Sequence, residues 1–549
     1  MGYNELNASW FIDQLIQQGV CHFCIAPGSR STPLALAIAD HPRASYTVHF
    51  DERGLGFFAL GYAQGNRRPV AIVVTSGPAV ANLLPAVMES CHSAVPLILL
   101  TSDHPPEARD NSSNQTSNQI KAFSNWIQWE FDFPPPSAEI EEKFIRSQVA
   151  QAVFRARKGP VQLNCMFRKP LWEKSADPYP IGQPIEYTYP YETLAPADIE
   201  MWSQRLSGKR GLILIGRMQN REEIPAIFEL AHKLRWPICA DVLSQARTLN
   251  PPAELMRHPH HLIPPSPPEI VLRFGEVFVT SSVCKDSAGF VVHISPQERL
   301  CDPDHRQQAR VKLSARSFCQ ALSPMPSENS WLKQWHQLDL AVGQKVETLF
   351  QSFLAHTESS AMRLISATIP AGWSYFLGTS MPVREADLFL YPNQPIQFYS
   401  NRGVSGIDGT LATAIGIAKG SGSPLVAIIG DQACLHDLSS FALLPTLITP
   451  FILILSNNFG GGIFSYLPIF GKTPHFEALL GAAHVWRFSS AAQMFGIPYE
   501  QTEDWSGSLQ RAIARGGPTI LEWTTSRAKN LEFHQNLHPA TRHLHSTGR

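Results

Sequence analysis

The sequence predicts an α/β protein made of three domains, each built on a parallel sheet. Short apolar runs alternate with stretches of helical periodicity over most of the chain, as a parallel sheet covered by helices requires. The chain has 549 residues, of which 44% are hydrophobic and 17% charged, which is enough for about three domains with sizeable cores. A stretch rich in Pro and Tyr interrupts the pattern and marks a boundary between the first two domains.

Composition argues against several classes of partner. The formal net charge is -1 and no basic block occurs, so we expect no binding to nucleic acid or to a membrane surface. No apolar run approaches the roughly 20 residues of a spanning helix, and the N-terminal segment has polar and acidic residues where a signal peptide would be basic and apolar. We therefore expect a cytoplasmic protein. Its nine cysteines, an odd number, favour reduced thiols over a disulfide framework.

The first domain is expected to span residues 1–168. Its strands are predicted at "HFCIAP", "PVAIVVTSG" and "VPLILLTSD". Cys21 and Cys24 have the CxxC spacing of redox and zinc sites, but no second pair occurs and the segment resembles a buried strand, which favours structural cysteines. In "VHFDERGLGFF", Asp51 and Glu52 follow a strand and precede a helix, where acids often stabilise the helix N-terminus.

Residues 169–194 form the Pro- and Tyr-rich linker, which cannot hold a regular helix or sheet. The central domain is expected over residues 195–345, with strands at "GLILIGRM", "WPICADVL", "EVFVTSS" and "FVVHISP". No GxGxxG follows the first of these strands, so a dinucleotide site is not indicated. The "HPHH" of residues 258–261 is flanked by prolines and has no acid or Cys at ligand spacing, so we expect a solvated loop.

The third domain, residues 350–549, contains a predicted β-α-β unit. "PLVAIIGD" is a buried strand ending at Asp431, "LHDLSSFALLPTLIT" has helical spacing, and "PFILILSNN" is a strand ending on Asn457 and Asn458. Polar groups at the carboxyl ends of parallel strands face one site. A carboxylate, an amide oxygen and a backbone carbonyl of "NNFGG" suit a Mg²⁺ that also takes phosphate oxygens, although each piece alone is more often a turn or a helix cap.

The combination resembles the thiamine diphosphate motif, which begins with GDG and closes with NN; here the third position is Gln432. The three-domain order is similar to that of thiamine diphosphate enzymes of the acetohydroxyacid synthase type. The stretches "IAPGSRSTPLALA", "HFDERGLG", "TSGPAVANLLPA", "SNRGVSGIDG" and "SNNFGGGIFSYLP" resemble the 2-succinyl-5-enolpyruvyl-6-hydroxy-3-cyclohexene-1-carboxylate synthase (MenD) family of menaquinone biosynthesis. The likeness covers nearly the whole chain and is weakest between Lys169 and Ala371.

The resemblance implies thiamine diphosphate and Mg²⁺, or Mn²⁺, as cofactors. It places at Glu52 the acid that hydrogen-bonds N1′ of the pyrimidine, a contact that lets the cofactor's own 4′-imino group remove the thiazolium C2 proton. The other cofactor positions that it implies are Ile407 beneath the bent cofactor, Gly430 at the diphosphate, Asp431, Asn458 and Gly460 at the metal, and Ile463, Phe464 and Leu467 as a dry wall over the thiazolium.

The MenD family decarboxylates 2-oxoglutarate and adds the resulting succinyl carbanion equivalent to isochorismate, a conjugate addition of Stetter type. Both substrates carry two carboxylates, and Arg suits their planar, bidentate recognition. The positions that the resemblance implies are Ser380, Arg384 and Arg402 for the oxoglutarate-derived carboxylate, and Ser29, Arg30, Gln115 and Lys285 for isochorismate.

The chain departs from the family in two places. His104 stands where members have the Arg of "DRPPE", so one cationic contact depends on pH, and the Lys-Arg pair of the middle domain is reduced to Lys285.

The family also implies a homodimer or homotetramer with active sites at the subunit interface, so that Glu52 and Asp431 of one site come from different subunits. The alternatives are another thiamine diphosphate decarboxylase or carboligase, and a non-catalytic α/β binding protein, which would explain the periodicity alone.

Overall fold

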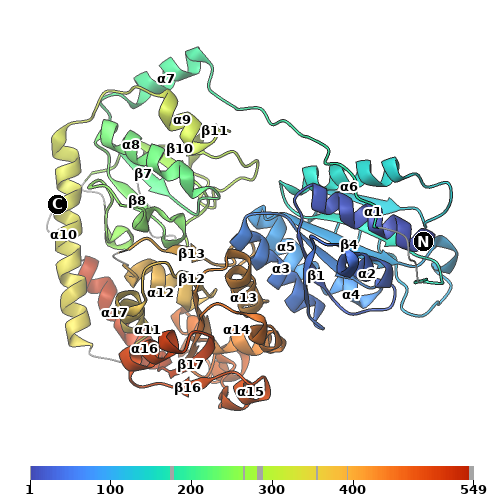
Figure 1. Cartoon of the computed structure of the whole chain (residues 1–549). Helices are drawn as coiled ribbons and strands as arrows, with labels where there is room; N and C mark the ends of the chain where they lie inside the picture. The colour runs from blue at the N-terminus through green and yellow to red at the C-terminus, as the bar shows by residue number, and fades with distance from the viewer. Residues whose placement is uncertain are drawn as a thin grey trace.

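The computed structural model describes residues 2–173, 179–263, 266–280, 289–353, 357–391 and 394–542. These residues form three sheets whose neighbouring strands all run parallel, so the predicted α/β class is confirmed (Figure 1). The first sheet has the strand order β2-β1-β3-β4-β6-β5, and the third repeats it as β13-β12-β14-β15-β17-β16. In each of them the order reverses beside the first strand, and ligands of open α/β sheets bind at the carboxyl ends of the strands that flank such a point.

The four inner strands of the first sheet, β1, β3, β4 and β6, are fully buried, as expected for strands covered on both faces, whereas the edge strands β2 and β5 are partly exposed. Its strands are β1 (His22–Ile25), β2 (Ser45–Val48), β3 (Val70–Val74), β4 (Leu97–Asp103), β5 (Trp129–Phe133) and β6 (Val161–Met166). Its helices are α1 (Tyr3–Gln17), α2 (Thr32–Asp40), α3 (Glu52–Asn66), α4 (Pro78–Ala81), α5 (Leu84–Ser93) and α6 (Glu142–Ala156). The described residues between 167 and 195 contain no helix or strand and connect this sheet to the second one (Figure 1).

The second sheet has the order β11-β10-β9-β7-β8. Its elements are β7 (Gly211–Ile215), β8 (Ile238–Ala240), β9 (Ile270–Phe274), β10 (Phe290–Ile294), β11 (Gln307–Val311), α7 (Pro196–Leu206), α8 (Ile224–Leu234), α9 (Ala315–Ala321) and α10 (Asn329–Ser352). The strand predicted at "EVFVTSS" is wrong over residues 276–280, the part of it that the structure describes, because β9 is the apolar run before it. Gly275 ends β9 with a φ of 74°, and the backbone N–H of Val279 then donates to the side chain of Asp241 at 2.6 Å instead of to a strand.

The "HPHH" segment also differs from its prediction. His258, His260 and His261 are 7%, 8% and 8% exposed, so the solvated loop expected there is wrong. Nε2 of His260 lies 3.0 Å from Oδ2 of Asp387. Asp387 lies in the third domain, more than 100 residues further along the chain, so the sequence around the histidines does not indicate this partner.

The third sheet carries the predicted β-α-β unit. Its elements are β12 (Ser374–Leu377), β13 (Gln397–Tyr399), β14 (Leu425–Gly430), β15 (Phe451–Asn457), β16 (Tyr499–Gln501), β17 (Pro518–Thr524), α11 (Glu358–Thr368), α12 (Met381–Phe389), α13 (Thr410–Ser421), α14 (Asp431–His436), α15 (Ser489–Met494), α16 (Trp505–Arg515) and α17 (Arg527–Arg542). The helix predicted after Asp431 is only partly confirmed. A short α-helix passes into a 3₁₀ segment, Leu438–Thr446, in which Pro445 has no N–H to donate.

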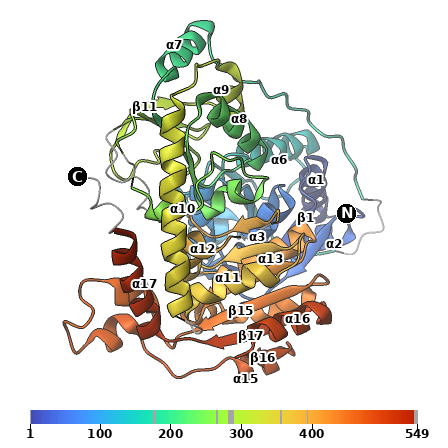
Figure 2. The ribbon, with the colours of Figure 1, turned by 90° about the vertical axis from the view of Figure 1, so that its left-hand side faces the viewer.

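Two pairs of packed helices connect the three sheets. α3 of the first sheet lies along α13 of the third, and their side chains share one core with β3 and β14 (Figure 1). On another side, the long helix α10 runs from the second sheet down to α17 and packs against it (Figure 2). The carboxyl ends of the strands in the first and third sheets are thereby fixed relative to each other.

Candidate active site

Asp431 and the turn after β15 come together at the carboxyl edge of the third sheet. β14 and β15 pair so that Gly430 lies opposite Ser456. Asp431 follows as the first residue of α14, is 2% exposed, and accepts a hydrogen bond at Oδ2 from the backbone N–H of Gly460 at 2.9 Å. A buried carboxylate therefore stands directly beside the "NNFGG" turn.

The amide of Asn458 has one end engaged and the other without a partner. Its Nδ2 donates to Oε1 of Glu358 at 3.0 Å, whereas its Oδ1 is buried and accepts no hydrogen bond. A buried oxygen left in this way is costly unless a ligand completes it. The Asp431 carboxylate, this amide oxygen and a carbonyl of the turn fit a hard cation such as Mg²⁺.

Glu358 is a site residue that the sequence did not reveal. It begins α11, is 4% exposed, and its Oε1 also accepts from Oγ of Ser456 at 3.2 Å. Burial and the nearby carboxylate of Glu385 raise the pKa of Glu358 to about 7. By accepting from the nitrogen end of the Asn458 amide, Glu358 turns the oxygen end toward the carboxyl edge.

The unusual third position of the motif, Gln432, fastens a neighbouring segment. Its Nε2 donates to the backbone carbonyls of Gly481 and Ala482, at 3.3 Å each. Close by, Nε2 of His484 lies 3.2 Å from Oδ2 of Asp431, and both side chains are buried. Burial raises the pKa of Asp431. The side chain that replaces the glycine of the usual motif thus holds residues 481–484 beside the acid.

Ser380 and Arg384 lie where the strand order of the third sheet reverses, between β12 and β14. Ser380 follows β12 and begins α12, and Nη1 of Arg384 donates to its carbonyl oxygen at 2.5 Å. Burial and the positive charge of Arg402 lower the pKa of Arg384, so the two guanidinium groups lie near each other. This concentration of positive charge suits a carboxylate ligand.

The loop that carries Arg402 is held by a second acid that the sequence did not reveal. Glu89 of α5 is 1% exposed, and its carboxylate accepts from the backbone N–H groups of Gly403 at 2.6 Å and Val404 at 2.7 Å. Burial lowers the pKa of Arg402. Glu89 therefore fixes the loop from the first domain while leaving the guanidinium of Arg402 for other partners.

Glu52 and Asp51 stand side by side but have different partners. Asp51 is the N-cap of α3, since its Oδ1 accepts from the backbone N–H groups of Arg53 and Gly54, and Oγ of Ser439 donates to its Oδ2 at 2.5 Å. Glu52 accepts a hydrogen bond from Nδ2 of Asn82 at 3.1 Å. Of the two acids, Glu52 is the one whose carboxylate is not needed to hold the helix.

Ser29, Arg30 and Gln115 line one cavity of about 560 Å³. It lies beyond β1 and β3, where the strand order of the first sheet reverses. Gln115 has a φ of 59° and is held against Ser76, whose Oγ donates to its carbonyl at 2.9 Å, while Nε2 of Gln115 donates back at 3.1 Å. His104 also lines this cavity, and burial together with the charge of Arg30 lowers the pKa of its imidazole.

The apolar positions are only partly gathered within one chain. Ile407 packs against the core shared by α3 and α13. Ile463 and Phe464 are half-buried in the 3₁₀ segment Gly462–Tyr466, whereas Leu467 is 43% exposed. Lys285, the remaining predicted contact, lies outside the described residues. A wall made of these side chains therefore stays open on the side of Leu467 in the single chain.

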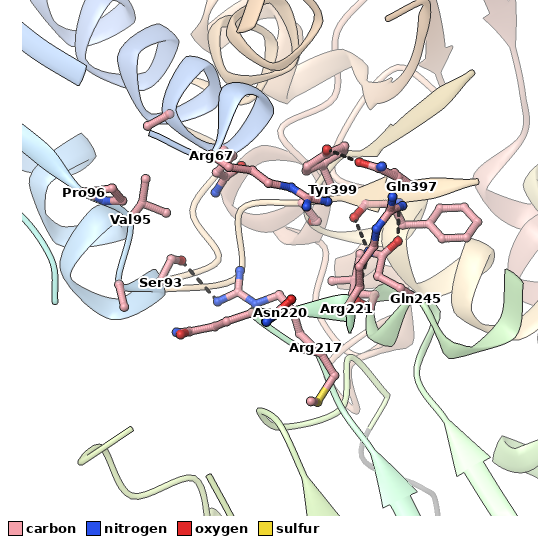
Figure 3. Close-up of a pocket in the computed structure, with 18 residues that line it drawn as sticks. Arg67, Ser93, Val95, Pro96, Arg217, Asn220, Arg221, Gln245, Gln397 and Tyr399 are labelled. Atoms are coloured by element: carbon pink, nitrogen blue, oxygen red, sulfur yellow. Dashed lines mark hydrogen bonds between the residues drawn. The ribbon is translucent and has the colours of Figure 1, made fainter. Parts of the chain in front are cut away.

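A second cavity, of about 410 Å³, lies where the three sheets approach one another, and none of the predicted site residues lines it (Figure 3). Arg67 and Arg221 lie on either side of Tyr399 there. Arg217, also in its lining, pairs with Glu276 at 2.7 Å and donates to Ser93 at 3.3 Å. This cavity is distinct from the one that contains Arg30.

Other candidate sites are not supported in the described residues. Within these ranges, no group of three or more His, Cys, Asp or Glu side chains is placed to hold a metal ion. Cys24 is buried in β1, which raises the pKa of its thiol, and no disulfide joins the described cysteines. None of the described helices combines the length and apolar character that a bilayer span needs.

Comparisons with known proteins identify the family to which this chain is similar. Residues 7–133 match the N-terminal TPP binding domain of thiamine pyrophosphate enzymes, residues 171–377 the middle domain of thiamine pyrophosphate enzymes, and residues 380–523 their C-terminal TPP binding domain. The chain is 38% identical to the 2-succinyl-5-enolpyruvyl-6-hydroxy-3-cyclohexene-1-carboxylate synthase of Rubrobacter xylanophilus, over 97% of this chain and 98% of the relative. The synthases of Salinibacter ruber and Chloroflexus aurantiacus are each 35% identical, over 96% of this chain and 94% of the relative.

Proposed function

Since the chain belongs to the 2-succinyl-5-enolpyruvyl-6-hydroxy-3-cyclohexene-1-carboxylate synthase family of thiamine diphosphate enzymes, we propose that it decarboxylates 2-oxoglutarate and adds the succinyl unit to isochorismate. The observation that supports these substrates most is the placing of the arginines. Arg384 and Arg402 lie together at the reversal point of the third sheet, and Arg30 lines a cavity at the reversal point of the first. Two dicarboxylate substrates need such separate cationic sites.

Thiamine diphosphate, when bound, supplies the electron sink that lets CO₂ leave a 2-oxo acid. We propose that Mg²⁺, or Mn²⁺ in its place, is held by the Asp431 carboxylate, Oδ1 of Asn458 and the backbone carbonyl of Gly460, with Gly430 beside the diphosphate. The support is the buried, partnerless amide oxygen next to a buried carboxylate. The metal would neutralise the diphosphate while the protein contributes a single carboxylate charge.

Glu52 is proposed to hold a hydrogen bond and a proton at N1′ of the pyrimidine. The choice of Glu52 over Asp51 is supported by the contacts of Asp51, whose two oxygens are both engaged within the fold. Ile407 would support the bend of the cofactor, and Ile463, Phe464 and Leu467 would exclude water from the thiazolium. An apolar environment would favour loss of CO₂, because this step replaces a charged carboxylate by a less polar group.

The substrates are proposed to bind on opposite sides of the cofactor. Ser380, Arg384 and Arg402 would hold the distal carboxylate derived from 2-oxoglutarate, which is present before and after CO₂ leaves. Isochorismate, which arrives second, would meet Ser29, Arg30 and Gln115. Short backbone contacts from Arg384 to Ser380 and from Glu89 to the loop of Arg402 keep the first site rigid, which favours a bound carboxylate in one orientation.

The assembly is proposed to be a homodimer or homotetramer with active sites at the subunit interface. Exposed apolar side chains are frequent in the segment from Leu467 to Met494: Leu467, Ile469, Phe470, Leu479, Val485, Trp486 and Met494. The wall over the cofactor is incomplete on this side of the single chain. A second subunit would cover the exposed groups and supply its own Glu52.

The experiment that tests the function is an assay with 2-oxoglutarate and isochorismate, following CO₂ release and product mass, with and without thiamine diphosphate and Mg²⁺. We expect a product equal in mass to isochorismate plus succinic semialdehyde, and dependence on both cofactors. If CO₂ were released but isochorismate were not consumed while another acceptor was, the chain would be a different carboligase. A panel of 2-oxo acids and aldehyde acceptors distinguishes that alternative.

A further inference from the structure

The cavity around Arg30 contains more cationic side chains than the sequence predicted. Arg168 and Lys169 also line it, together with His104 and Glu107. Arg168 is neutralised, because its Nε donates to Oε1 of Glu107 at 2.6 Å and its Nη2 to Oε2 at 3.1 Å. In the described part of the chain, no carboxylate lies within ion-pair distance of the ammonium of Lys169.

The backbone at Lys169 is held in place from both sides. Nδ2 of Asn4 donates to the carbonyl of Arg168 at 2.7 Å and to that of Pro170 at 2.8 Å. Nη1 of Arg30 donates to the carbonyl of Phe167 at 2.8 Å. The guanidinium of Arg30 is thus anchored to the same short segment that carries Lys169, while the lysine side chain is left exposed at the cavity.

His104 does not supply a charge in this cavity at neutral pH. Burial lowers the pKa of its imidazole, and the positive charges of Arg30 and Lys169 lower it further against the opposing effect of Asp103. Among the residues that the structure describes, the other cationic side chains of the cavity without a carboxylate within ion-pair distance are Arg30 and Lys169. Two cations without such partners, from two different loops, are the complement of a small dianion.

We propose that Lys169 binds one carboxylate of isochorismate while Arg30 binds the other. This inference rests on the proposed function, and it names a substrate contact in the segment after β6. A guanidinium gives a fixed, bidentate contact, whereas an ammonium on a flexible four-carbon stem adapts to the second carboxylate. Lys169 would thereby provide the second positive contact for isochorismate in the cavity where His104 stays neutral.

The test compares Lys169→Met with the unmodified enzyme and with Lys158→Met. Lys158 is an exposed lysine just before β6, outside the cavity, so its removal controls for the loss of a surface charge. In Lys169→Met we expect the KM for isochorismate to rise about tenfold or more, the effect of one lost charge-assisted contact. The KM for 2-oxoglutarate and the first burst of CO₂ should not change, and Lys169→Arg should recover most of the affinity.

A second measurement uses two acceptors that each lack one of the two carboxylates of isochorismate. Lys169→Met should lower kcat/KM for one of these acceptors and leave it unchanged for the other, because the side chain faces a single carboxylate. An equal loss with both acceptors, an unchanged KM for isochorismate, or a matching loss in Lys158→Met would overturn the proposal. Failure of the proposed function is seen separately, as absence of product from isochorismate in the unmodified enzyme.

Discussion

Neighbouring residues of the same chemical type have different roles in this molecule, and their hydrogen bonds distinguish them. Both carboxylate oxygens of Asp51 accept hydrogen bonds within the protein. Desolvation raises the pKa of Asp51, but the hydrogen bonds that it accepts, chiefly from Ser439, outweigh this effect and lower the pKa. Glu52, one residue on, accepts a side-chain hydrogen bond from Asn82. A carboxylate that already caps a helix cannot also act on a ligand without loosening that helix.

Glu52→Gln tests this division at the level of single side chains. Gln keeps the shape of the side chain but lacks the carboxyl group proposed to protonate N1′, so exchange of the cofactor's C2 proton, followed by NMR, should slow far more than cofactor binding weakens. The free energy of unfolding should hardly change. Asp51→Ala is the matched control, and it should lower that free energy by about 1 kcal/mol through loss of the cap. A normal exchange rate in Glu52→Gln would move the role to another acid.

The two arginine sites predict different kinetic defects. Arg402→Ala removes the proposed contact to the carboxylate derived from 2-oxoglutarate, which is present in both half-reactions, so both CO₂ release and addition should fall. Arg30→Ala should spare the first burst of CO₂ and impair the addition, by roughly thirtyfold for a lost contact of about 2 kcal/mol. Pre-steady-state measurement of CO₂ and of product separates the two steps. Equal loss of the burst in both variants would place Arg30 beside the first substrate or the cofactor.

Some residues of the proposed site could be predicted from the sequence because they follow strands in recognisable motifs, as Asp431 and Asn458 do. Glu358 and Glu89 were not. Each acts on a segment at a large distance in the sequence, Glu358 on Asn458 and Glu89 on the loop of Arg402. An acid whose partners are backbone N–H groups or an amide of another domain leaves no local pattern, so only the folded chain reveals it.

At the scale of elements, the crossing of α3 and α13 depends on glycine. A Cβ added at Gly61 would lie 2.0 Å from the carbonyl oxygen of Thr413, and one at Gly416 would lie 2.1 Å from that of Phe58. Gly65 and Gly420, each one turn further on, are similarly close to the facing backbone. The two helices therefore approach backbone to backbone, which no larger residue permits. α3 begins at Glu52 and α13 follows Ile407, so this contact sets the spacing of two proposed cofactor residues.

Gly416→Ala should accordingly destabilise the chain by about 3 kcal/mol or more, because neither facing backbone can move away without opening the shared core. The measurement is chemical denaturation, with cofactor binding followed in the same samples. Gly517→Ala is the control, since nothing lies within 4 Å of an added Cβ there. It should change the free energy of unfolding by less than about 1 kcal/mol. Equal stability of the two variants would show that the helices separate easily.

Element boundaries show what apolar pattern does and does not predict. β1, β3, β4, β14 and β15 were predicted, because each is an apolar run ended by a small or polar residue. At "IVLRFGEVFVTSS" two such runs flank Gly275, and the pattern alone does not choose between them. The first run becomes β9 because it pairs with β7 and β10, whereas in the second run the backbone N–H of Val279 donates to the side chain of Asp241. Such choices are made by tertiary contacts.

At the scale of the whole molecule, two sheets of identical strand order each present one half of the proposed site. The third sheet carries the residues proposed to hold the metal and 2-oxoglutarate, and the first carries Glu52 and the cavity of Arg30. In the described part of the chain, Glu52 has its side-chain hydrogen bond with Asn82 of its own domain, and no hydrogen bond joins it to Asp431 or Asn458. Exposed apolar groups such as Val485 and Trp486, 86% and 60% exposed, lie near the Asp431 edge. This arrangement favours a site completed by a second copy of the chain.

Mixing two inactive variants tests that assembly directly. In Glu52→Gln and in Asp431→Asn every site of the pure protein carries the lesion, so each alone should be nearly inactive. If one site takes Glu52 from one subunit and Asp431 from the other, a mixed dimer has one site with both lesions and one with neither. Random association makes about half of all dimers mixed, so the co-expressed variants should recover about a quarter of the unmodified activity.

Recovery should disappear when the variants are purified separately and mixed without subunit exchange. Activity that stayed at the level of the single variants in demonstrably mixed dimers would place both residues of each site in one chain.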